Sequence, residues 1–536
     1  MSIIGNHRIE EDSLDQGILP NLQNVEFPHD LNNVKNSFRD FYSVSPPFGY
    51  VGIEVDNETG RLRYRILEPN VEENEKWILK ELKDVIIERM DVPLSILDDR
   101  SAMEKYLREL TDVEFSRLKK KVAIESEEKF LYYIFRDFLG YGIINILMLD
   151  PKIEDISCNG LDTPIYVWHR DYESIATNVT YSSKTELARI VTRLSYKTGH
   201  QISVAQPLVE GTLPEGHRVQ LTMEEVSKRG KTFTIRKFRS NPFTIIDLIK
   251  FGTISPKVAA YLWIIIENLR SVMVCGATAS GKTALLNCLS SFINPEQKVV
   301  TIEEVRELRL HENWIPLVTR QSYQPGVMEV TLFDLLKSAL RQRPDYIIVG
   351  EVRGEEAYTL FQSIAVGHGG LCTIHADSVK SVIKRLLSRP MNIPEMMLPL
   401  MNVIIQIGRI KKEGKIVRRV MNVSEIVSRP ISNVAQITEI VEIKTRFEWD
   451  PETDSYIFNE PSEIDHFLDN EKDVFTLISE TNHIPLEQII EEQQRRELVL
   501  KWMTKKNIQS VQKVSEIIRN YYTDPDTIYH QARLGV

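Results

Sequence analysis

The sequence predicts an α/β protein of about three domains, because the pattern of apolar and β-branched residues changes twice along its 536 residues. One hydrophobic core seldom serves a chain of this length. Apolar residues recur at helical spacing from 72 to 138, which predicts a mainly helical N-terminal domain over residues 31–138. Short β-branched runs follow, interrupted by one helical stretch at 184–197, and they predict an α+β domain over residues 139–242. Strands and helices then alternate over residues 243–430, as in a parallel sheet covered by helices on both faces.

The two ends of the chain differ from these domains in composition. Residues 1–60 carry ten Asp or Glu against three Lys or Arg, with several prolines among them, so we expect a disordered acidic extension over residues 1–30. Residues 431–536 show a hairpin pattern at 437–458 and then charge-rich helical patterns. We expect a C-terminal hairpin followed by helices.

The bulk composition excludes several classes of protein. With 42% hydrophobic and 26% charged residues, the chain resembles ordinary globular proteins. The net charge of −10 argues against an electrostatic nucleic-acid binder, which needs a basic face. The longest apolar run, Val258 to Ile266, is far shorter than the roughly 20 residues that span a bilayer, and the N-terminus has no apolar signal core. Four scattered cysteines without a C-x-x-C pair predict neither zinc nor disulfides. We therefore expect a cytoplasmic protein.

A phosphate-binding loop follows the apolar run 271–275 and precedes a helix-like stretch. It reads G-x-x-x-x-G-K-T and consists of Gly276, Ala277, Thr278, Ala279, Ser280, Gly281, Lys282 and Thr283. Strand, loop and helix in this order form the setting of a P-loop, whose backbone N–H groups surround a polyphosphate. We expect Lys282 to reach the β- and γ-phosphates of ATP and the Thr283 hydroxyl to hold Mg²⁺.

Carboxylates follow two strand-like runs downstream of this loop. The run 346–349 leads through Gly350 to Glu351, in the manner of a Walker B strand that delivers a carboxylate close to Mg²⁺. The run 299–302 leads to Glu303, Glu304 and Glu307, so three carboxylates leave one strand tip together. Their mutual repulsion favours a site that Mg²⁺ or an arginine neutralises.

Two histidines flank a glycine-rich strand entry at 367–375. His368 and His375 lack the spacing and the cysteine partners of a zinc site. We interpret His375 as a group that reports on the γ-phosphate, and the alternative for both histidines is a place in the core with satisfied hydrogen bonds.

Three arginines precede the P-loop in the α+β domain. Arg218 follows a turn, and Arg236 and Arg239 follow a strand-like run. Arginines supplied by another domain or subunit stabilise the charge that develops during nucleotide hydrolysis, so these three are candidate arginine fingers. The alternative is that they are solvated surface residues.

Together these residues resemble the secretion ATPase superfamily, which comprises the hexameric motors of type II and type IV secretion, type IV pili and their archaeal relatives. The resemblance covers about residues 140–410. It includes the GATASGKT loop, the TIEEVREL acidic box, the run Gly350 to Arg353 and the box from His368 to His375. The acidic extension, the helical N-terminal region and the C-terminal helices make the chain most similar to the archaeal branch, and within it to the archaellum motor ATPase.

The resemblance implies roles for individual residues. Glu307 aligns with a glutamate that acts as general base, Glu351 with the Walker B carboxylate and His375 with the histidine of the His box. Many bacterial relatives read Ile-Glu-Asp-Pro where this chain has Glu303-Glu304-Val305 after Ile302, so whether Glu303 or Glu307 handles the water stays open. The chain also lacks the paired cysteines that bind zinc in many bacterial members.

The resemblance implies a RecA-like P-loop NTPase domain and a Mg²⁺-dependent ATPase with active sites between the subunits of a hexamer. The expected partners are a polytopic membrane platform protein and archaellum accessory proteins at the inner face of the cytoplasmic membrane. An archaeal pilus-assembly or type II-like secretion ATPase is the close alternative, and a RecA-like nucleic-acid motor is the distant one. The net charge and the absence of an aromatic and basic strand-binding run lead us to expect no stable nucleic-acid binding.

Overall fold

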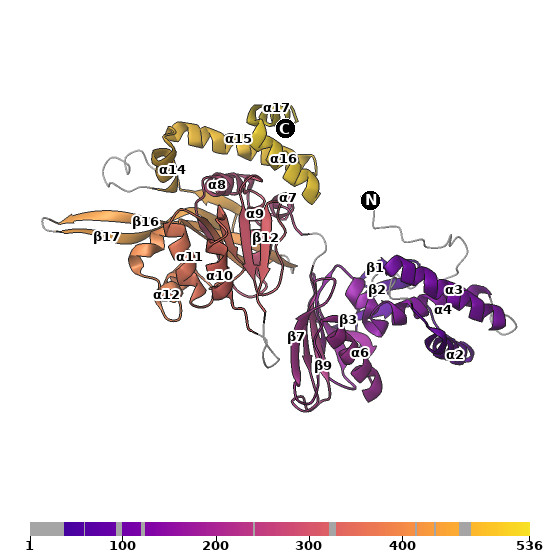
Figure 1. Ribbon diagram of the computed structural model, residues 1–536. Coiled ribbons are helices and arrows are strands. Elements are labelled where there is room, and N and C mark those ends of the chain that lie inside the picture. The colour runs from indigo at the N-terminus through magenta and orange to yellow at the C-terminus, as the bar shows by residue number, and fades with distance from the viewer. Residues whose placement is uncertain are drawn as a thin grey trace. The chain divides into compact units, whose positions relative to one another are not determined.

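The structure is a computed structural model of the chain, and it divides into two compact units, Met1–Phe238 and Arg239–Val536 (Figure 1). It describes residues 37–57, 59–92, 99–118, 124–238, 242–320, 328–412, 415–433, 436–459 and 473–535. The acidic extension expected over residues 1–30 lies outside the described residues. Each unit contains one nine-stranded sheet.

The sheet of the first unit joins strands from distant parts of the sequence. Its order is β1 (Asp40–Ser45), β2 (Gly49–Val55), β3 (Leu62–Leu67), β6 (Glu173–Thr180), β5 (Pro164–His169), β4 (Ile153–Cys158), β9 (Thr232–Arg236), β8 (Arg218–Thr222) and β7 (Leu208–Thr212). Neighbouring strands are antiparallel except β3 and β6. The core also includes α6 (Lys184–Lys197), which is the helix expected from the sequence, and the short η2 (Gly142–Ile144) and α5 (Asn145–Leu149).

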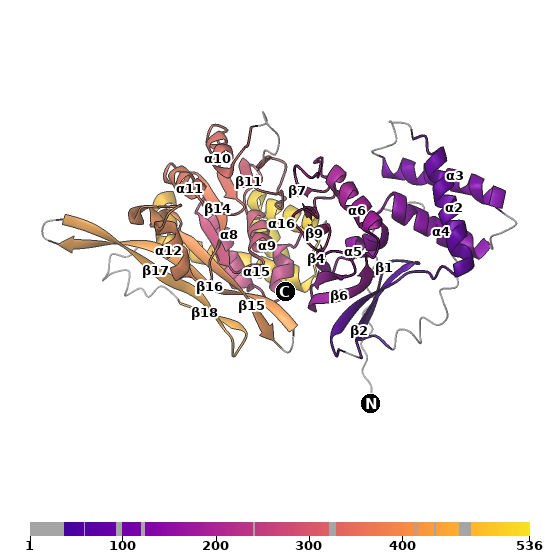
Figure 2. The ribbon, with the colours of Figure 1, turned by 90° about the horizontal axis from the view of Figure 1, so that it is seen from below.

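The helical part of the first unit is shorter than we expected. Helices α2 (Glu73–Arg89), α3 (Arg100–Leu118) and α4 (Ile124–Phe138) form a small core of their own and lie together (Figure 2). Residues 40–67, which we assigned to the mainly helical domain, instead form β1 to β3 and extend the sheet. Val51, Ile53, Tyr64 and Ile66 alternate inward with the period of two that a half-buried strand requires.

The second unit has a mixed sheet with the parallel part first. Its order is β12 (Trp314–Val318), β11 (Val299–Glu303), β13 (Tyr346–Val349), β14 (Gly369–His375), β10 (Val272–Gly276), β15 (Val403–Lys412), β16 (Lys415–Asn433), β17 (Gln436–Asp450) and β18 (Ser455–Phe458). The strands are parallel from β12 to β15 and antiparallel from β15 to β18. The order β11-β13-β14-β10-β15, with the P-loop strand β10 inside the sheet, confirms the predicted RecA-like α/β fold.

Helices cover both faces of this sheet because alternate strand residues face opposite sides. Val272 and Val274 pack with α8 (Pro256–Glu267) and α9 (Lys282–Ser290), and α7 (Ile245–Lys250) lies in the same cluster. Met273 and Cys275 pack instead with α10 (Leu332–Leu340), α11 (Glu356–Ala365), α12 (Val379–Leu387) and η3 (Glu395–Leu400). The sheet is therefore buried on both faces, which is the usual state of parallel sheets.

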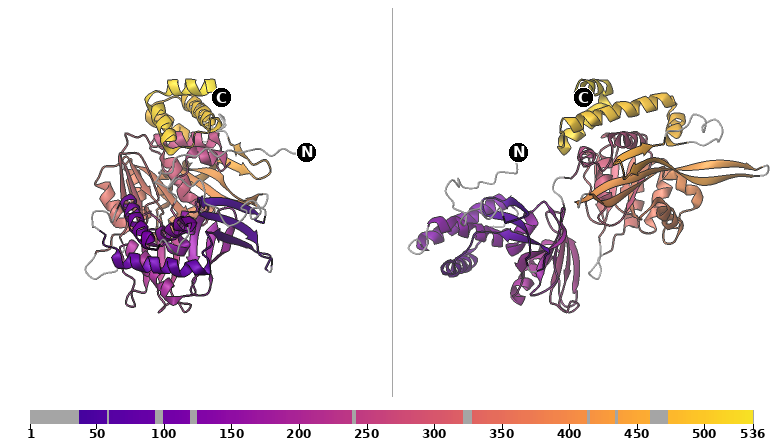
Figure 3. Two further views of the ribbon diagram at one scale, coloured as in Figure 1. Left: turned by 90° about the vertical axis from the view of Figure 1, so that its right-hand side faces the viewer. Right: turned by 180° about the vertical axis from the view of Figure 1, so that it is seen from behind.

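The C-terminal helices complete the core of the second unit. They are α14 (Val474–Asn482), α15 (Leu486–Lys505), α16 (Val511–Thr523) and α17 (Pro525–Gly535), and two views show them on the side of α8 (Figure 3). Arg496 is 3% exposed, pairs with Glu267 of α8, and lies over the ring of Trp263. The boundary that we placed at residue 430 falls inside β16, because this strand and the following helices share one core with the P-loop helix.

One pair of described segments has the length and apolar composition of a membrane span. No single helix in the described part of the chain has both the length and the apolar composition of a span. Two segments bent by 101°, Glu127–Phe138 and Gly142–Leu149, meet these two criteria as a pair.

Candidate active site

The P-loop is shaped by close backbone packing at the end of β10. A Cβ added to Gly276 would lie 2.4 Å from the carbonyl oxygen of Ile407 and 2.5 Å from Ser280 Oγ, so only glycine fits there. Ala279 adopts a φ of 59° and Gly281 a φ of 96°, and Gly281 caps the N-terminus of α9. The backbone therefore turns sharply enough to direct the positive end of the helix dipole at the loop.

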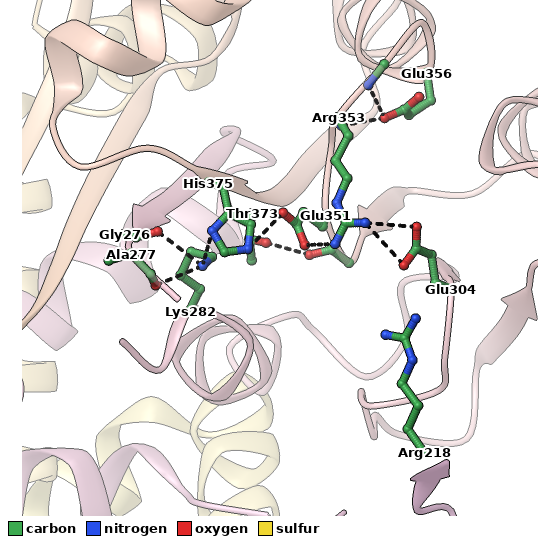
Figure 4. Close-up of polar contacts among 12 residues, drawn as sticks. Arg218, Gly276, Ala277, Lys282, Glu304, Glu351, Arg353, Glu356, Thr373 and His375 are labelled. Atoms are coloured by element: carbon green, nitrogen blue, oxygen red, sulfur yellow. Dashed lines mark hydrogen bonds and ion pairs between the residues drawn. The ribbon is translucent and has the colours of Figure 1, made fainter. Parts of the chain in front are cut away.

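Lys282 is held inside this loop. Its Nζ donates to the carbonyl oxygens of Gly276 and Ala277, each at 3.1 Å, and lies 3.3 Å from His375 Nδ1 (Figure 4). The side chain is buried, with 8% of the residue exposed. A lysine ammonium can only donate hydrogen bonds, so Nδ1 of His375 accepts and the ring proton resides on Nε2.

The other nitrogen of His375 faces the Walker B carboxylate. Nε2 lies 3.2 Å from Oε1 of Glu351, the residue two positions after β13. Burial lowers the pKa of His375, and the nearby Lys282 ammonium lowers it further. The neutral ring therefore lies between the P-loop lysine and Glu351, whose Oε1 has no hydrogen-bond partner among the described residues.

Arg353 joins Glu351 to the acidic box. Its Nη2 donates to Glu351 Oε2 at 2.7 Å, and its Nη1 donates to both carboxylate oxygens of Glu304 at 3.3 and 3.5 Å (Figure 4). The hydrogen bond with Glu351 raises the pKa of Arg353 further above its ordinary value. Glu356 fixes the turn, because its Oε1 accepts from the backbone N–H groups of Arg353 and Gly354. Arg353 is thus the arginine that neutralises the carboxylate cluster.

Glu303 and Glu307 occupy different environments. Glu303 is 3% exposed, and its Oε1 accepts from the backbone N–H groups of Glu307 and Leu308 at 2.9 and 3.0 Å. Burial raises the pKa of Glu303 to about 7. Glu307 is only partly buried. Glu303 therefore holds the acidic loop in shape, while the Glu307 side chain is accessible from solvent.

The two histidines of the His box lie at opposite ends of β14. His375 ends the strand, beside the P-loop, whereas His368 precedes it and contacts the carbonyl oxygen of Pro344 at 2.7 Å. A seven-residue strand spans roughly 20 Å, so His368 is remote from the P-loop. Of the two readings for His368, the structure matches the satisfied structural histidine.

The residues at this sheet edge fit ATP and Mg²⁺. Ser280 Oγ and Glu303 Oε2 are buried without a hydrogen-bond partner among the described residues, so polar atoms of the loop and of the acidic strand remain to be satisfied. An ammonium, loop N–H groups and a helix N-terminus suit phosphates, and the Thr283 hydroxyl with the Glu351 carboxylate suits Mg²⁺.

Two of the three candidate arginine fingers, Arg218 and Arg236, belong to the first unit. Arg218 and Arg236 face each other across β8 and β9, and Arg236 faces Asp155 on β4. Arg218 Nε also donates to Glu210 Oε1 at 2.5 Å. The structure thus brings two of the three arginines together, and Arg239 lies outside the described residues.

Two site residues were missed by sequence reasoning. Arg353 follows Glu351 by two residues, and this spacing could have indicated that the arginine lies beside the Walker B carboxylate. Arg418 of β16 donates from Nε to the carbonyl oxygen of Ala279 at 3.4 Å, and nothing near it in the sequence marks it as a P-loop contact.

Known proteins are similar to this chain over a region that contains the P-loop. Residues 140–519 match the protein family described as Type II/IV secretion system protein. Uncharacterized protein MJ0900 of Methanocaldococcus jannaschii is 36% identical over 439 residues, which is 78% of this chain and 78% of that protein. Type IV secretion system protein PtlH of Bordetella pertussis is 30% identical over 277 residues, covering 46% of this chain and 80% of PtlH.

Solved structures give a further comparison. The VirB11 ATPase of the Brucella suis type IV secretion system is 26% identical, covers 51% of this chain and 89% of that chain, and aligns with a TM-score of 0.27. The family match and MJ0900 carry the assignment, because the family match spans residues 140–519 and MJ0900 is 36% identical over 78% of this chain. The chain therefore belongs to the type II/IV secretion system protein family, and it is an ATPase.

Proposed function

We propose that this ATPase is a Mg²⁺-dependent hexameric motor that powers assembly or rotation of an archaeal type IV pilus-like filament, the archaellum, at the cytoplasmic membrane. The observation that carries the ATPase chemistry is the line of contacts from Lys282 through His375 to Glu351. The archaeal role is supported by the long match to MJ0900 of an archaeon and by the family resemblance of the sequence.

Each residue of the site has a defined task in this proposal. Lys282 and the N–H groups of the loop bind the β- and γ-phosphates, and Thr283 and Glu351 hold Mg²⁺. Bound Mg²⁺ neutralises charge on the β- and γ-phosphate oxygens. Glu307, accessible beside the buried Glu303, orients the attacking water and accepts its proton. His375 responds to the γ-phosphate through the lysine that it contacts.

Movement between the two units is the output that we propose for this motor. The P-loop lies in the second unit, while Arg218 and Arg236 lie in the first. If these arginines complete the site of a neighbouring subunit, loss of the γ-phosphate removes the charge that holds them, and one unit moves relative to the other. A ring of subunits with a polytopic membrane platform and archaellum accessory proteins as partners would pass this motion to a filament.

A second candidate function is pilus assembly or protein secretion by the same chemistry. The similarity to PtlH, a type IV secretion system protein, favours it. The two functions differ in what the cell loses when the motor stops. A filament motor is needed for filaments or for swimming, whereas a secretion motor is needed for release of substrate proteins.

The test is a deletion strain complemented with the unchanged chain, with Glu351→Gln, or with Glu395→Gln as a control at an exposed position. Electron microscopy counts filaments, tracking measures swimming and analysis of the medium detects secreted proteins. We expect Glu351→Gln alone to abolish archaella and swimming. Normal swimming with a loss of other pili or of secreted proteins would favour the second candidate, and normal behaviour in all three assays would refute both.

A further inference from the structure

The base of the β15–β16 hairpin lies directly against the P-loop. Ile407 of β15 contributes the carbonyl oxygen that excludes a side chain at Gly276, and its Cδ1 lies 3.7 Å from the Cβ position of Gly281. Arg418 of β16 approaches the same glycine, with Cδ at 3.3 Å from that position. The hairpin therefore forms the wall of the loop on the side of β15.

Arg418 contacts the most strained part of the loop. Its Nε donates to the carbonyl oxygen of Ala279, which adopts a φ of 59°. A non-glycine residue in the left-handed region costs roughly 1–2 kcal/mol. Because C=O and N–H point in opposite directions in a trans peptide, a hydrogen bond to this carbonyl from outside fixes the orientation of the Ser280 N–H on the other side.

The backbone of Arg418 is itself anchored. The neighbouring Arg419 is 5% exposed and donates from Nη1 to the carbonyl oxygens of Arg418 and Phe251, each at 2.9 Å. Its Nε and Nη2 donate to the two carboxylate oxygens of Asp454 at 2.8 and 3.0 Å. Lys412 and Trp449 Nε1 also donate to Asp454, at 2.6 and 2.9 Å. One carboxylate thus ties the hairpin to the turn between β17 and β18.

A second arginine adds positive charge beside the first. Arg409 of β15 faces Arg418 in the antiparallel register, so both side chains leave the same face of the sheet as Ile407.

We propose that Arg418 is a positioning residue of the P-loop, which holds Ala279 and Gly281 in their binding conformation and thereby raises the affinity for nucleoside di- and triphosphates. This inference rests on the proposed function for the identity of the nucleotide. The contact is made within one unit of one chain, so it serves ADP as well as ATP and needs no neighbouring subunit.

The experiment compares Arg418→Ala, Arg418→Lys and Lys411→Ala in the full chain. Lys411 is exposed, lies on β15 two residues beyond Arg409 and serves as the charge-matched control. Calorimetry with ADP and Mg²⁺ gives Kd, and phosphate release over a range of ATP concentrations gives KM and kcat. We expect Arg418→Ala to raise both Kd for ADP and KM for ATP by about tenfold, equivalent to about 1.4 kcal/mol, with kcat changed little.

Further variants separate this role from a general loss of structure. Arg418→Lys keeps the charge and should recover part of the affinity, and Lys411→Ala should leave all constants unchanged. Asp454→Asn should weaken ADP binding in the same direction, and its effect should not add to that of Arg418→Ala, because both act on one contact. Unchanged Kd and KM in Arg418→Ala, or a fall in kcat alone, would overturn the inference. If the unchanged chain binds ADP without hydrolysing ATP, the proposed function fails while the ADP comparison still decides the role of Arg418.

Discussion

His375 Nε2 lies 3.2 Å from Glu351 Oε1, so the last residue of β14 touches the carboxylate that follows β13. The same ring accepts from Lys282 on its other side. Three motifs far apart in the sequence therefore share one chain of contacts, because parallel strands place their carboxyl ends at one edge of the sheet.

The two ends of this chain of contacts should fail in different ways. Lys282→Ala removes a charge-assisted contact to phosphate and should abolish both tight ATP binding and turnover. Glu351→Gln keeps the phosphate contacts and should still bind ATP while hydrolysing it at least about a hundredfold more slowly. Malachite-green phosphate release and nucleotide-binding titrations measure the two quantities, with Glu395→Gln as an exposed control. Rates like those of the unchanged chain in either variant would contradict the assignment.

Substitutions at the two candidate carboxylates of the acidic box, Glu303 and Glu307, should affect ATPase activity differently. Glu307→Gln should bind ATP but lose turnover if Glu307 activates the water. Glu303→Gln should retain most of its activity, because a glutamine oxygen can still accept from the N–H groups of Glu307 and Leu308. Steady-state kinetics of both variants measure their ATPase activities. If Glu303→Gln loses turnover and Glu307→Gln keeps it, Glu303 is the residue that activates the water.

Glu303 should also make stability depend on pH. Burial raises its pKa from 4.5 to about 7, so the folded state binds more protons than the unfolded state between these values. The contribution of this group to the free energy of unfolding therefore falls by up to about 3 kcal/mol as the pH rises from about 4.5 to about 7. Urea unfolding at pH 5 and pH 8 measures the free energy of unfolding of both proteins. Relative to the unchanged chain, Glu303→Gln should be more stable at pH 8 than at pH 5. An equal difference at both values would show that Glu303 ionises normally.

Catalysis across subunits predicts rescue by mixing. If Arg218 reaches the site of a neighbour, inactive Arg218→Ala and inactive Lys282→Ala subunits combined in one ring form some interfaces with two intact halves. Such mixtures should regain part of the ATPase activity. Mixtures of Lys282→Ala with Glu351→Gln, both altered in the second unit, are the matched control and should stay inactive. Mixtures with Arg218→Ala that never exceed either variant alone would place all catalytic groups in one chain.

The site was predictable where its signals are local. The P-loop and the carboxylates after β11 and β13 each form a short motif after a buried strand, and the parallel sheet then brings them together. Arg418 could not be found in this way, because its contact with Ala279 depends on how the β15–β16 hairpin turns back along the P-loop strand. The environments of Glu303 and Glu307 likewise depend on loop conformation, which motif spacing does not fix.

The fold was predictable in its class and less so in its boundaries. The alternation of strands and helices after Thr244 predicted the parallel sheet, and the RecA-like assignment came from the family resemblance. The first sheet was misjudged because β3 pairs with β6 across more than a hundred residues, through Arg63 with Ala176 and Tyr64 with Thr177. Such a pairing leaves no local trace, and the acidic, proline-interrupted composition before Tyr64 obscured the short alternating strands.

The partly buried Lys237, at the end of the first unit, gives a prediction of opposite sign to that of Glu303. Lys237 Nζ donates to the carbonyl oxygens of Leu147 and Asp150, at 2.9 and 2.5 Å, and burial lowers its pKa to about 8. The unfolded chain, with a lysine pKa of 10.5, holds the proton more tightly between these values, so stability rises as pH increases from about 8. At lower pH the charged form is buried at a cost of at most about 3 kcal/mol.

Lys237→Met should therefore abolish this rise. It also leaves two carbonyl groups without their donor, but that loss does not depend on pH, so the readout is the slope of stability against pH rather than its absolute value. Urea unfolding of the unchanged chain, Lys237→Met and the exposed control Lys228→Met should be followed from about pH 7.5 to about pH 9.5. Tyr42 and Tyr64, whose pKa values burial raises, begin to ionise in the unfolded chain near the upper end of this range, but they do so equally in all three proteins, so the comparison of the curves still isolates Lys237. We expect a rise in the unchanged chain and in Lys228→Met and none in Lys237→Met, whereas parallel curves for all three proteins would show that Lys237 stays charged in the folded protein throughout this range.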